Sequence, residues 1–593
     1  MGAIVRSIFL FLSLVTCAVA ETNDAPRIRT MIVEAHRAGQ KKVTIPPGTY
    51  HMAATEGARA SVLLTKLRDF EIDATGVEFI GTDRKSTMFF FDRCENVTLR
   101  GARLRYDPLP FTQGRIEAIA PDRRSLDIRV DEGYPNDLDD RVYYGAEGPI
   151  IANVFDDTTK LWRRDVADIF GTEFQKIEPG LFRMTVQSPV PKVDLIGAPI
   201  AWRGNGTADI RIYQSARMQM LDLEIRNAIG FCIHENGGEG GNYYRYTVTR
   251  GPAPAGAKEA PLFSANADAF HSSNVRRGPT LEDCVLEYTD DDGIPIHGAY
   301  ALVADAQKNT LAVLQKDFAR EGDTLRVYDK AGGFQGSAKV TDLMIAGKDF
   351  QPQPGYNEGA HAFQDAGRVS FAQVAMDKPL EWQEGWRVAN VDALGSGFVI
   401  RRCKIRHVRA RGILVKANDG LIEDNVIEGT TMAGIALWPE MGHWDESDYS
   451  HRVTIRRNTV RDVALWELRG NGMAGALTVG AREGRSFVAS REGHRDIVIE
   501  DNVFENNSGV NLLITTAQGV RATGNTFLRP MQQASTRGAA TGLDPASLIW
   551  ITESRNVTLS GNTLTDPGTH LRERVTVTPS TSAITQGDAF RKD

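Results

Sequence analysis

The stretch GFVIRRCKIRHV, residues 397–408, is followed by DGLIEDNVIEG, residues 419–429, and the two segments share one design. Each holds a short strand-like apolar segment, a polar residue near its end, and a second short apolar segment. The same design recurs in RVTIRRNTVRDV (452–463), DIVIEDNVFENN (496–507), GVRATGNTFLRP (519–530) and NVTLSGNTLTDP (556–567), and earlier in NVTLRGARLR (96–105). Self-similarity of this kind indicates a repeat architecture in which each unit stacks on its neighbours.

The spacing of equivalent residues gives the size of the repeat. Cys403 and Asn425 are 22 residues apart, and Asn502 and Asn525 are 23 residues apart. A coil of this length, made of three short strands and three turns, is typical of a parallel β-helix, whose stacked strands lie about 4.8 Å apart. An asparagine at a bend can bond its stacked counterpart. The sequence therefore predicts an all-β parallel β-helix, and a propeller or sandwich of unrelated short strands is the alternative.

Two stretches interrupt the repeat and divide the 593-residue chain. Over about 108–202 and 299–395, longer alternating segments replace the 22-residue pattern and predict two inserted β-rich modules of barrel or sandwich type. The coils then occupy 21–107, 203–298 and 396–570, and a C-terminal tail covers 571–593. Modules inserted in a solenoid often sit on one face and form walls of a binding groove.

The N-terminal 20 residues have the features of a secretory signal peptide. Arg6 precedes a short apolar run that ends in Ala18-Val19-Ala20, so we expect cleavage after Ala20 and a secreted or periplasmic protein. The run is too short to span a membrane, and nothing comparable follows it; lipid attachment at Cys17 is the alternative. Beyond it, Ala25–Gly39 predicts a short helix that caps the first coil, with one apolar face made of Ile28, Met31, Ile32 and Ala35.

The composition excludes several classes of function. The chain has 69 Lys+Arg and 76 Asp+Glu, a net charge of −7, which becomes −8 when Arg6 is removed with the signal peptide. An acidic balance argues against a nucleic-acid-binding surface. The four cysteines of the mature chain are far apart and form no C-x-x-C pair, so we expect buried thiols rather than a zinc ribbon or a disulfide framework: Cys94, Cys232, Cys284 and Cys403.

Three aspartates form the most distinctive polar group of the chain. Asp268 lies in ADAFH (267–271), and Asp291 and Asp292 lie in DDDGIPIHG (290–298); Asp268 and Asp291 are 23 residues apart, about one coil. Carboxylates on neighbouring coils should lie within roughly 5–10 Å of each other on one outer face. Because such acids cannot all ionise readily, one pKa should rise and provide a proton donor beside an ionised base, as glycoside hydrolysis requires. A solvated turn or a calcium site are the alternatives.

A second set of residues is expected to bind the substrate. His271 and His297 flank the aspartates and are suited to orient them or to bind sugar hydroxyls. The rings of Trp438 and Trp444 could stack on sugar C–H groups while a nearby carboxylate accepts from hydroxyls. The full predicted set is His271, His297, Arg411, Lys416, Trp438, Trp444 and Glu446. The glycine-rich NGGEGG (236–241) lacks the lysine and the strand-loop-helix context of a phosphate-binding loop, so we interpret it as a flexible loop.

Several pieces together resemble a known family: YDPLPFTQG (106–114), ADAFH (267–271), Asp291-Asp292 with His297-Gly298, RGILV (411–415) and WDES (444–447). Over roughly residues 30–565 the chain resembles the pectin-lyase-like superfamily of right-handed parallel β-helices. Within it, the chain is most similar to the α-1,3-galactosidase family of glycoside hydrolases, family 110.

The resemblance implies an inverting hydrolase that needs no metal or cofactor. Its catalytic set would be Asp268, Asp291 and Asp292, with Asp291 as the general acid and the other two holding the water. Pro295 and Asp445 depart from the family pattern near the expected sugar site.

The sequence thus predicts an exported glycosidase that removes α-linked galactose or a related sugar from a glycan or oligosaccharide. Its mature charge of −8 and Asp-rich site favour a neutral sugar over a densely anionic polymer. One rival is a polysaccharide lyase, in which Lys416 or Arg411 abstracts a C5 proton from a uronate and the aspartates hold calcium. The other is a non-catalytic carbohydrate-binding β-helix whose acids are only turn residues.

Overall fold

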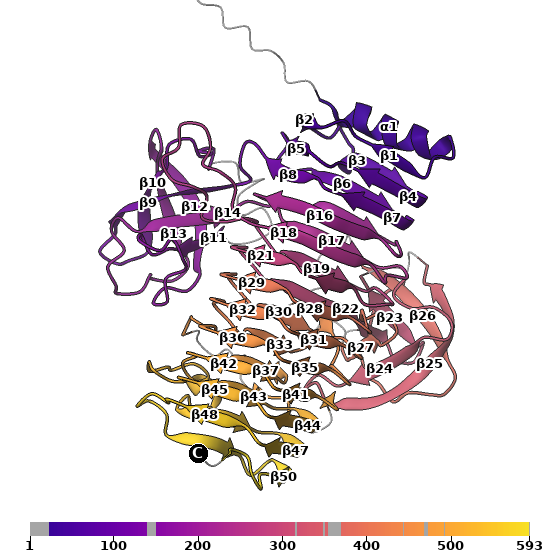
Figure 1. The fold of residues 1–593 in the computed structure, drawn as a ribbon. Coiled ribbons are helices and arrows are strands. Elements are labelled where there is room, and N and C mark those ends of the chain that lie inside the picture. The colour runs from indigo at the N-terminus through magenta and orange to yellow at the C-terminus, as the bar shows by residue number, and fades with distance from the viewer. Residues whose placement is uncertain are drawn as a thin grey trace, which may run out of the picture.

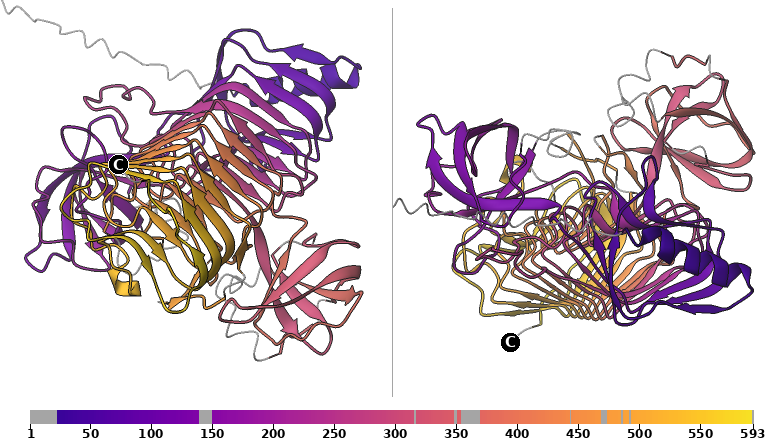
Figure 2. Two further views of the ribbon diagram at one scale, coloured as in Figure 1. Left: turned by 60° about the horizontal axis from the view of Figure 1, so that its bottom comes forward. Right: turned by 90° about the horizontal axis from the view of Figure 1, so that it is seen from above.

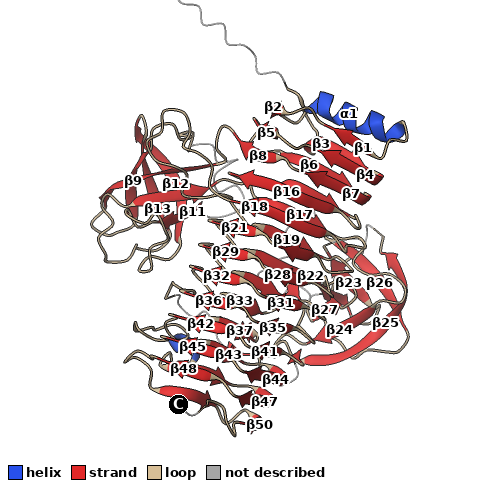
Figure 3. Ribbon diagram, in the orientation of Figure 1, coloured by secondary structure: helices blue, strands red, loops and turns tan. Residues whose placement is uncertain are grey.

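The computed structural model describes residues 23–138, 150–314, 317–347, 350–353, 369–442, 444–467, 473–484, 486–490 and 493–591. The strands stack into one long column of coils, and two smaller β modules are attached to its side (Figure 1). Strands dominate the fold, as Figure 3 shows. The predicted signal peptide and the expected cleavage after Ala20 lie outside the described residues.

The column is a parallel β-helix, as the repeats predict. β28 (Val399–Arg401), β31 (Leu421–Glu423), β35 (Thr454–Arg456) and β41 (Val498–Glu500) pair in parallel in that order. Their central isoleucines are in register and fully buried, and these are Ile400, Ile422, Ile455 and Ile499. Burying such a side chain stabilises a fold by about 1.5–3 kcal/mol, so this stack extends the hydrophobic core from coil to coil.

The repeated asparagine forms a ladder through the later coils. Its side chains are nearly inaccessible, and each amide Nδ2 donates to the Oδ1 of the next asparagine at 2.9–3.1 Å along Asn425, Asn458, Asn502, Asn525 and Asn562. The backbone N–H of each of the first four donates to the same oxygen, at 3.0–3.1 Å. Buried amides need such partners, because an unpaired one costs about 1–3 kcal/mol. The ladder explains why asparagine recurs at this bend.

The first attached module is a closed antiparallel barrel with its own core. Its strands follow the order β10-β13-β12-β11-β14-β9, and their bounds are β9 (Phe111–Ile119), β10 (Ser125–Val130), β11 (Ile150–Val154), β12 (Ile169–Glu178), β13 (Leu181–Val186) and β14 (Pro199–Arg203). The coils before and after it stack directly, since Thr98 of β7 (Glu95–Arg100) pairs with Gln219 of β16 (Gln219–Arg226). The barrel is therefore an insertion that leaves the stacking intact.

The second module begins inside a coil strand. β22 (Ile294–Asp305) pairs in parallel with neighbouring coils through its first half and in antiparallel fashion with module strands through its second half. The other module strands are β23 (Thr310–Val313), β24 (Thr324–Tyr328), β25 (Phe334–Ile345), β26 (Ser370–Met376) and β27 (Arg387–Asn390). Seen along the column, both modules project from the same side and stand apart from each other (Figure 2).

The N-terminal end of the column is covered by α1 (Ala25–Arg37), the expected capping helix. Ala25, Ile28, Ile32 and Ala35 face the core, whereas Met31 is only partly buried. The four cysteines are free thiols in buried positions, which confirms that expectation. Within the described residues, no helix combines the length and the apolar character needed to cross a bilayer.

Candidate active site

The three aspartates precede strands of one parallel sheet. Asp268 precedes β19 (Phe270–Ser273), and Asp291 and Asp292 precede β22, which lies between β19 and β30 (Ile413–Val415). The register of Ser272 with Ile296 and of Ile294 with Ile413 aligns Asp268, Asp292 and Arg411 on three successive coils. The aligned partner of Asp268 is thus Asp292, one residue later than a strict 23-residue coil predicts.

The fold brings the three carboxylates together. One oxygen from each of Asp268, Asp291 and Asp292 lies within 4.8 Å of the others. The backbone N–H of Asp292 donates to Asp268 Oδ1 at 2.9 Å. Asp268 and Asp292 are 5% and 4% exposed, and the side chain of Asp291 is 28% exposed. The run Asp290–Asp292 is therefore not a solvated turn, since Asp290 is also buried. Among the three acids of the cluster, Asp291 has the most accessible carboxylate.

Two arginines hold Asp291. Arg203, the last residue of β14, lies with its Nη1 3.1 Å from Asp291 Oδ2, and Arg409 Nη1 lies 3.3 Å from Oδ1. Arg409 also donates to both oxygens of Asp168, through Nε at 2.8 Å and Nη2 at 2.5 Å. Because Arg203 and Asp168 both come from the first module, that module helps to build the carboxylate cluster. Sequence analysis found none of these three residues.

The cluster separates the pKa values of its acids. Burial alone would raise the pKa of Asp291, but the charges of Arg409, Arg203 and Arg411 outweigh it and lower that pKa below its ordinary value. Burial, strengthened by the charge of Asp291, raises the pKa of Asp268 well above its ordinary value. Burial also raises the pKa of Asp292 to about 8, with Arg411 opposing and the other two acids adding to the rise.

The directions of these pKa shifts differ from the acid and base roles expected from the sequence. Asp291 had been the expected general acid, yet its surroundings favour the ionised carboxylate. The proton is instead favoured on the buried pair Asp268 and Asp292. The cause is the pair of arginines that contact Asp291. Arg203 and Arg409 lie 88 and 118 positions from Asp291 in the sequence, so no local sequence pattern indicates these contacts.

Arg411 contacts the carboxylate cluster through both its backbone and its side chain. Its backbone N–H donates to Asp292 Oδ1 at 2.6 Å, and its Nη2 lies 3.0 Å from Asp292 Oδ2 and 3.8 Å from Glu440 Oε1. Three arginines thus already neutralise the aspartates, and Arg411 donors take both oxygens of Asp292. A calcium ion takes six to eight oxygen ligands, so this donor set fits a calcium site poorly.

Lys416 and Glu446 form an ion pair next to His297. Lys416 is fully buried and its ammonium contacts the Glu446 carboxylate. His297 Nε2 lies 3.5 Å from Glu446 Oε1 and 3.0 Å from His271 Nε2, and His271 Nδ1 lies 2.8 Å from Asp268 Oδ2. Although burial opposes ionisation of Glu446, its contacts with His297 and Lys416 lower its pKa. His271 and His297 therefore contact the acids, and their ring nitrogens have protein partners.

The two tryptophans of the following loop differ. Trp438 is 4% exposed and packs with Leu414, Ala433 and Ala436, so the structure does not support it as a stacking platform for a sugar. Its apolar neighbours on adjacent coils explain this burial. Trp444 is 63% exposed. Next to it, Asp445 pairs at 2.8 Å with Arg387 of the second module, which fixes the loop to that module.

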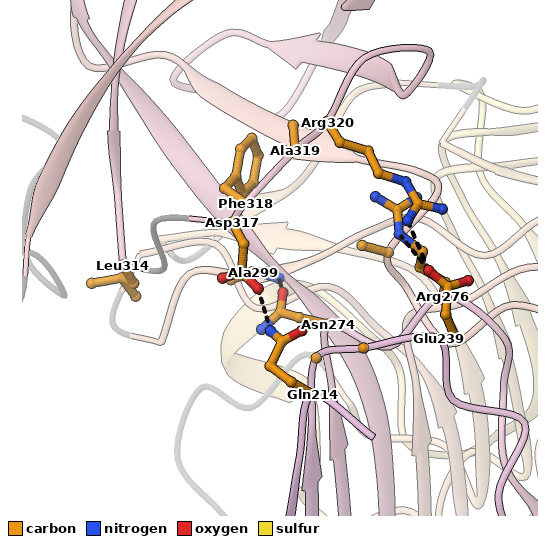
Figure 4. A pocket seen from close by; sticks show the side chains of 13 residues that line it. Gln214, Glu239, Asn274, Arg276, Ala299, Leu314, Asp317, Phe318, Ala319 and Arg320 are labelled. Carbon is orange, nitrogen blue, oxygen red and sulfur yellow. Dashed lines mark hydrogen bonds and ion pairs between the residues drawn. The ribbon is translucent and has the colours of Figure 1, made fainter. Parts of the chain in front are cut away.

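A small pocket of about 170 Å³ lies beyond the opposite end of β19, between the coils and the second module (Figure 4). Gln214 and Asn274 project into it from the coils, and Asp317, Phe318 and Arg320 approach from the module. Gln214 bonds Asp317, and Arg320 bonds Glu239 at 2.7 Å. Asp268, Asp291 and Asp292 do not line this pocket, which is a polar junction between coil and module.

Comparisons with known proteins agree with this architecture. Residues 393–571 match the family described as right handed beta helix region. The chain is a right-handed parallel β-helix protein. This β-helix protein is 22% identical over 517 residues to an α-1,3-galactosidase A from Shewanella woodyi, covering 84% of the chain and 79% of the relative.

The chain is also similar to two further proteins. An α-1,3-galactosidase B from Akkermansia muciniphila is 24% identical over 535 residues, which cover 82% of the β-helix protein and 61% of the relative. The β-helix protein thus spans less than two thirds of this second relative. A solved structure of the catalytic unit of an α-1,3-glucanase from Streptomyces thermodiastaticus aligns with a TM-score of 0.43 and 11% identity, covering 96% of the chain and 66% of that structure.

Proposed function

We propose that the β-helix protein is a glycoside hydrolase that cleaves α-linked galactose or a related sugar from a glycan. The observation that carries the proposal is the carboxylate cluster, in which oxygens of Asp268, Asp291 and Asp292 lie within 4.8 Å of one another while their pKa values move in opposite directions. A protonated acid beside an ionised carboxylate is what hydrolysis of a glycosidic bond requires. The α-1,3-galactosidase relatives support the glycosidase class and suggest the sugar.

The charges assign roles to the acids. The neighbouring arginines favour the ionised form of Asp291, and its carboxylate is accessible, so we assign it as the group that takes the proton of the attacking water. The raised pKa values of the buried pair Asp268 and Asp292 favour a proton there, and we assign this pair as the acid that protonates the leaving oxygen. Arg203 and Arg409 keep Asp291 ionised beside these two acids.

The contacts of the basic residues oppose the lyase alternative. A lyase base must reach a substrate C5 proton, yet Lys416 is fully buried against Glu446. Arg411 is occupied by Asp292 and Glu440, so neither residue offers an unneutralised cation to a uronate. The surroundings therefore favour a neutral sugar, and Trp444, exposed in the loop beyond Arg411, is suited to stack on its apolar face.

We further propose that the protein is exported, with cleavage after Ala20. The support is the N-terminal sequence, in which Arg6, an apolar run and Ala18-Val19-Ala20 follow in signal-peptide order. A glycan outside the cytoplasm would then be the partner.

Incubation with a panel of glycans tests the function. We expect release of galactose from α-1,3-linked galactosyl oligosaccharides, no new ultraviolet absorbance, and unchanged rates in excess chelator, because no step requires a metal. A lyase acting on a uronate polymer would instead create an absorbing double bond and would stop in chelator until calcium is restored. That result would replace the hydrolase assignment, and absence of any product from the whole panel would favour a binding protein.

The stereochemical course is a separate prediction. Both oxygens of Asp291 face arginine N–H donors. This arrangement suits a base that holds a water molecule in place. It suits a nucleophile less well, because a nucleophilic oxygen must bond to the sugar carbon. We therefore expect the anomeric configuration to invert, as the family resemblance implies. Proton NMR of freshly released galactose reads the anomer directly. Retention would instead match the short carboxylate spacing, since about 5–5.5 Å is usual in retaining enzymes.

A further inference from the structure

The second module has a pocket of its own, with a volume of about 390 Å³. It is lined by Ala306 and Gln307 in the turn after β22, by Gln335 in β25, and by residues 380–386 in the loop that leads into β27. The carboxylate cluster directly precedes β22 and the pocket directly follows it, and a strand of 12 residues spans up to about 40 Å. The pocket is therefore separate from the cluster, on a module that stands out from the column of coils (Figure 2).

Two tryptophans form the apolar part of this pocket. Trp382 is 7% exposed, belongs to the core of the module, and donates from Nε1 to the carbonyl oxygen of Ala306 at 3.3 Å. Trp386 packs against the same core but remains partly accessible. Both rings line the pocket. Because the core already holds these rings, a ligand that stacks on them loses little free energy to the ordering of side chains.

Side-chain amides form most of the polar part. Gln307, Gln335 and Gln383 are exposed, and Glu381 is the one charged group among the described residues that line the pocket. Gln335 Nε2 donates to Asp329 Oδ2 at 2.7 Å, which fixes this amide at the rim. Within the described part of the chain, the side chains of Gln307, Gln383 and Glu381 have no hydrogen-bond or ion-pair partner. Their polar atoms are therefore available to a ligand.

This combination of groups selects a class of ligand. Each amide offers a donor and an acceptor, and so does each sugar hydroxyl, while the C–H face of a sugar packs on an indole ring. An anion would need arginine or lysine, which are absent from the described lining, and Glu381 would repel it. A wholly apolar ligand would leave the amides unpaired. The volume lies in the range of about 300–1,000 Å³ that is usual for small-molecule sites.

We propose that this pocket of the second module is a binding site for a neutral sugar unit of a glycan, separate from the carboxylate cluster. The inference goes beyond the proposed hydrolase activity and does not depend on it. A branched or polymeric glycan that occupies both places gains avidity, because its second contact is made within the same complex.

Fluorine NMR of the full chain resolves where a sugar binds. The protein has eight tryptophans, so labelling with 5-fluorotryptophan gives few ¹⁹F lines, and Trp386→Phe and Trp444→Phe assign the two that decide the question. The protein carries Asp291→Asn, so that the probes are not consumed. The probes are neutral tetrasaccharides of galactose, glucose or mannose, with tetragalacturonate as their anionic counterpart. We expect the Trp386 line to move with at least one neutral probe and to stay in place with tetragalacturonate.

The outcomes separate this inference from the proposed function. If only the Trp444 line moves, or if the Trp386 line moves equally with tetragalacturonate, the second site is wrong while the hydrolase assignment stands. A Trp386 line that responds to a neutral probe, in a protein whose unmutated form hydrolyses no glycan, would keep the second site and remove the hydrolase. An unmoved Trp386 line with every neutral probe would overturn the inference whatever the catalytic activity.

A double variant tests the amides without disturbing the core. Gln307→Ala combined with Gln383→Ala removes two exposed side chains, so the fold should survive, and we expect the apparent Kd for the neutral probe to rise about tenfold. Gln175→Ala is the matched control, because it removes an exposed amide from β12 of the first module and should leave the Kd unchanged. Titration of the Trp386 line measures both. An unchanged Kd in the double variant would contradict the proposal.

Discussion

Asp291→Asn is expected to lower kcat on α-galactosides by at least about a thousandfold, because the change removes the base that takes a proton from water. The asparagine matches the aspartate in size, and the side chain is partly exposed, so the fold should survive. The loss should be as large on a nitrophenyl galactoside as on a disaccharide, since activating water is needed for both. Rates on the two substrates, with thermal unfolding of the variant, check this expectation.

The same assay separates the acid from the base. Asp268→Asn should be inactive on the disaccharide but recover much of its rate on the nitrophenyl substrate, whose leaving group departs without a proton. Asp424→Asn is the control, because Asp424 pairs with Arg457 on the exposed side of a later coil, and it should leave activity unchanged. Recovery of Asp291→Asn rather than Asp268→Asn would restore Asp291 as the acid, and near-normal rates in both would end the carboxylate mechanism.

Arg409→Leu is expected to damage both stability and catalysis. Its partner Asp168 is 9% exposed at the side chain and would lose both of its guanidinium contacts. Breaking a buried ion pair from one side typically costs about 3–5 kcal/mol, so the free energy of unfolding should fall by about that amount. Arg452→Leu, which breaks an exposed pair with Asp419, should cost much less. Denaturant unfolding of the two variants measures the difference.

The catalytic effect of Arg409→Leu follows from the sign of the pKa change. Arg409 lowers the pKa of Asp291, so its loss raises that pKa. The proposed mechanism requires ionised Asp291, so the acidic limb of the pH–rate profile should move to higher pH, with the largest losses at acidic pH. Asp168→Asn combined with Arg409→Leu should recover part of the stability, because no buried charge is left without a partner, but not the activity. An unmoved acidic limb would show that Arg409 does not set the ionisation of Asp291.

The fold was accessible to sequence analysis because its information is local and repeated. Ile422 and Asn425 recur with the same neighbours in coil after coil, and one coil predicts the next. The aspartates were found for the same reason, since Asp268 and Asp291 are about one coil apart. Arg203 and Asp168 were not found, because they reach the cluster through the inserted barrel and no period relates them to it. Trp438 was misjudged because an apolar ring in a loop sequence looks the same whether the loop covers the core or faces solvent.

The placement of the second module within β22 has a consequence for how the chain assembles. Asp292 stacks beside Arg411, although 119 residues separate them, and the same offset joins Thr280 to Val399 and Val285 to Lys404. The coil that carries the acids and the coil that carries Arg411 cannot dock until the intervening chain has become compact, because long loops must be closed before distant strands can pair. The stacks on either side of the break can form from neighbouring segments alone. The carboxylate cluster thus belongs to a late folding step, and a nascent chain that ends before residue 409 contains the three acids and Arg203 but neither Arg409 nor Arg411.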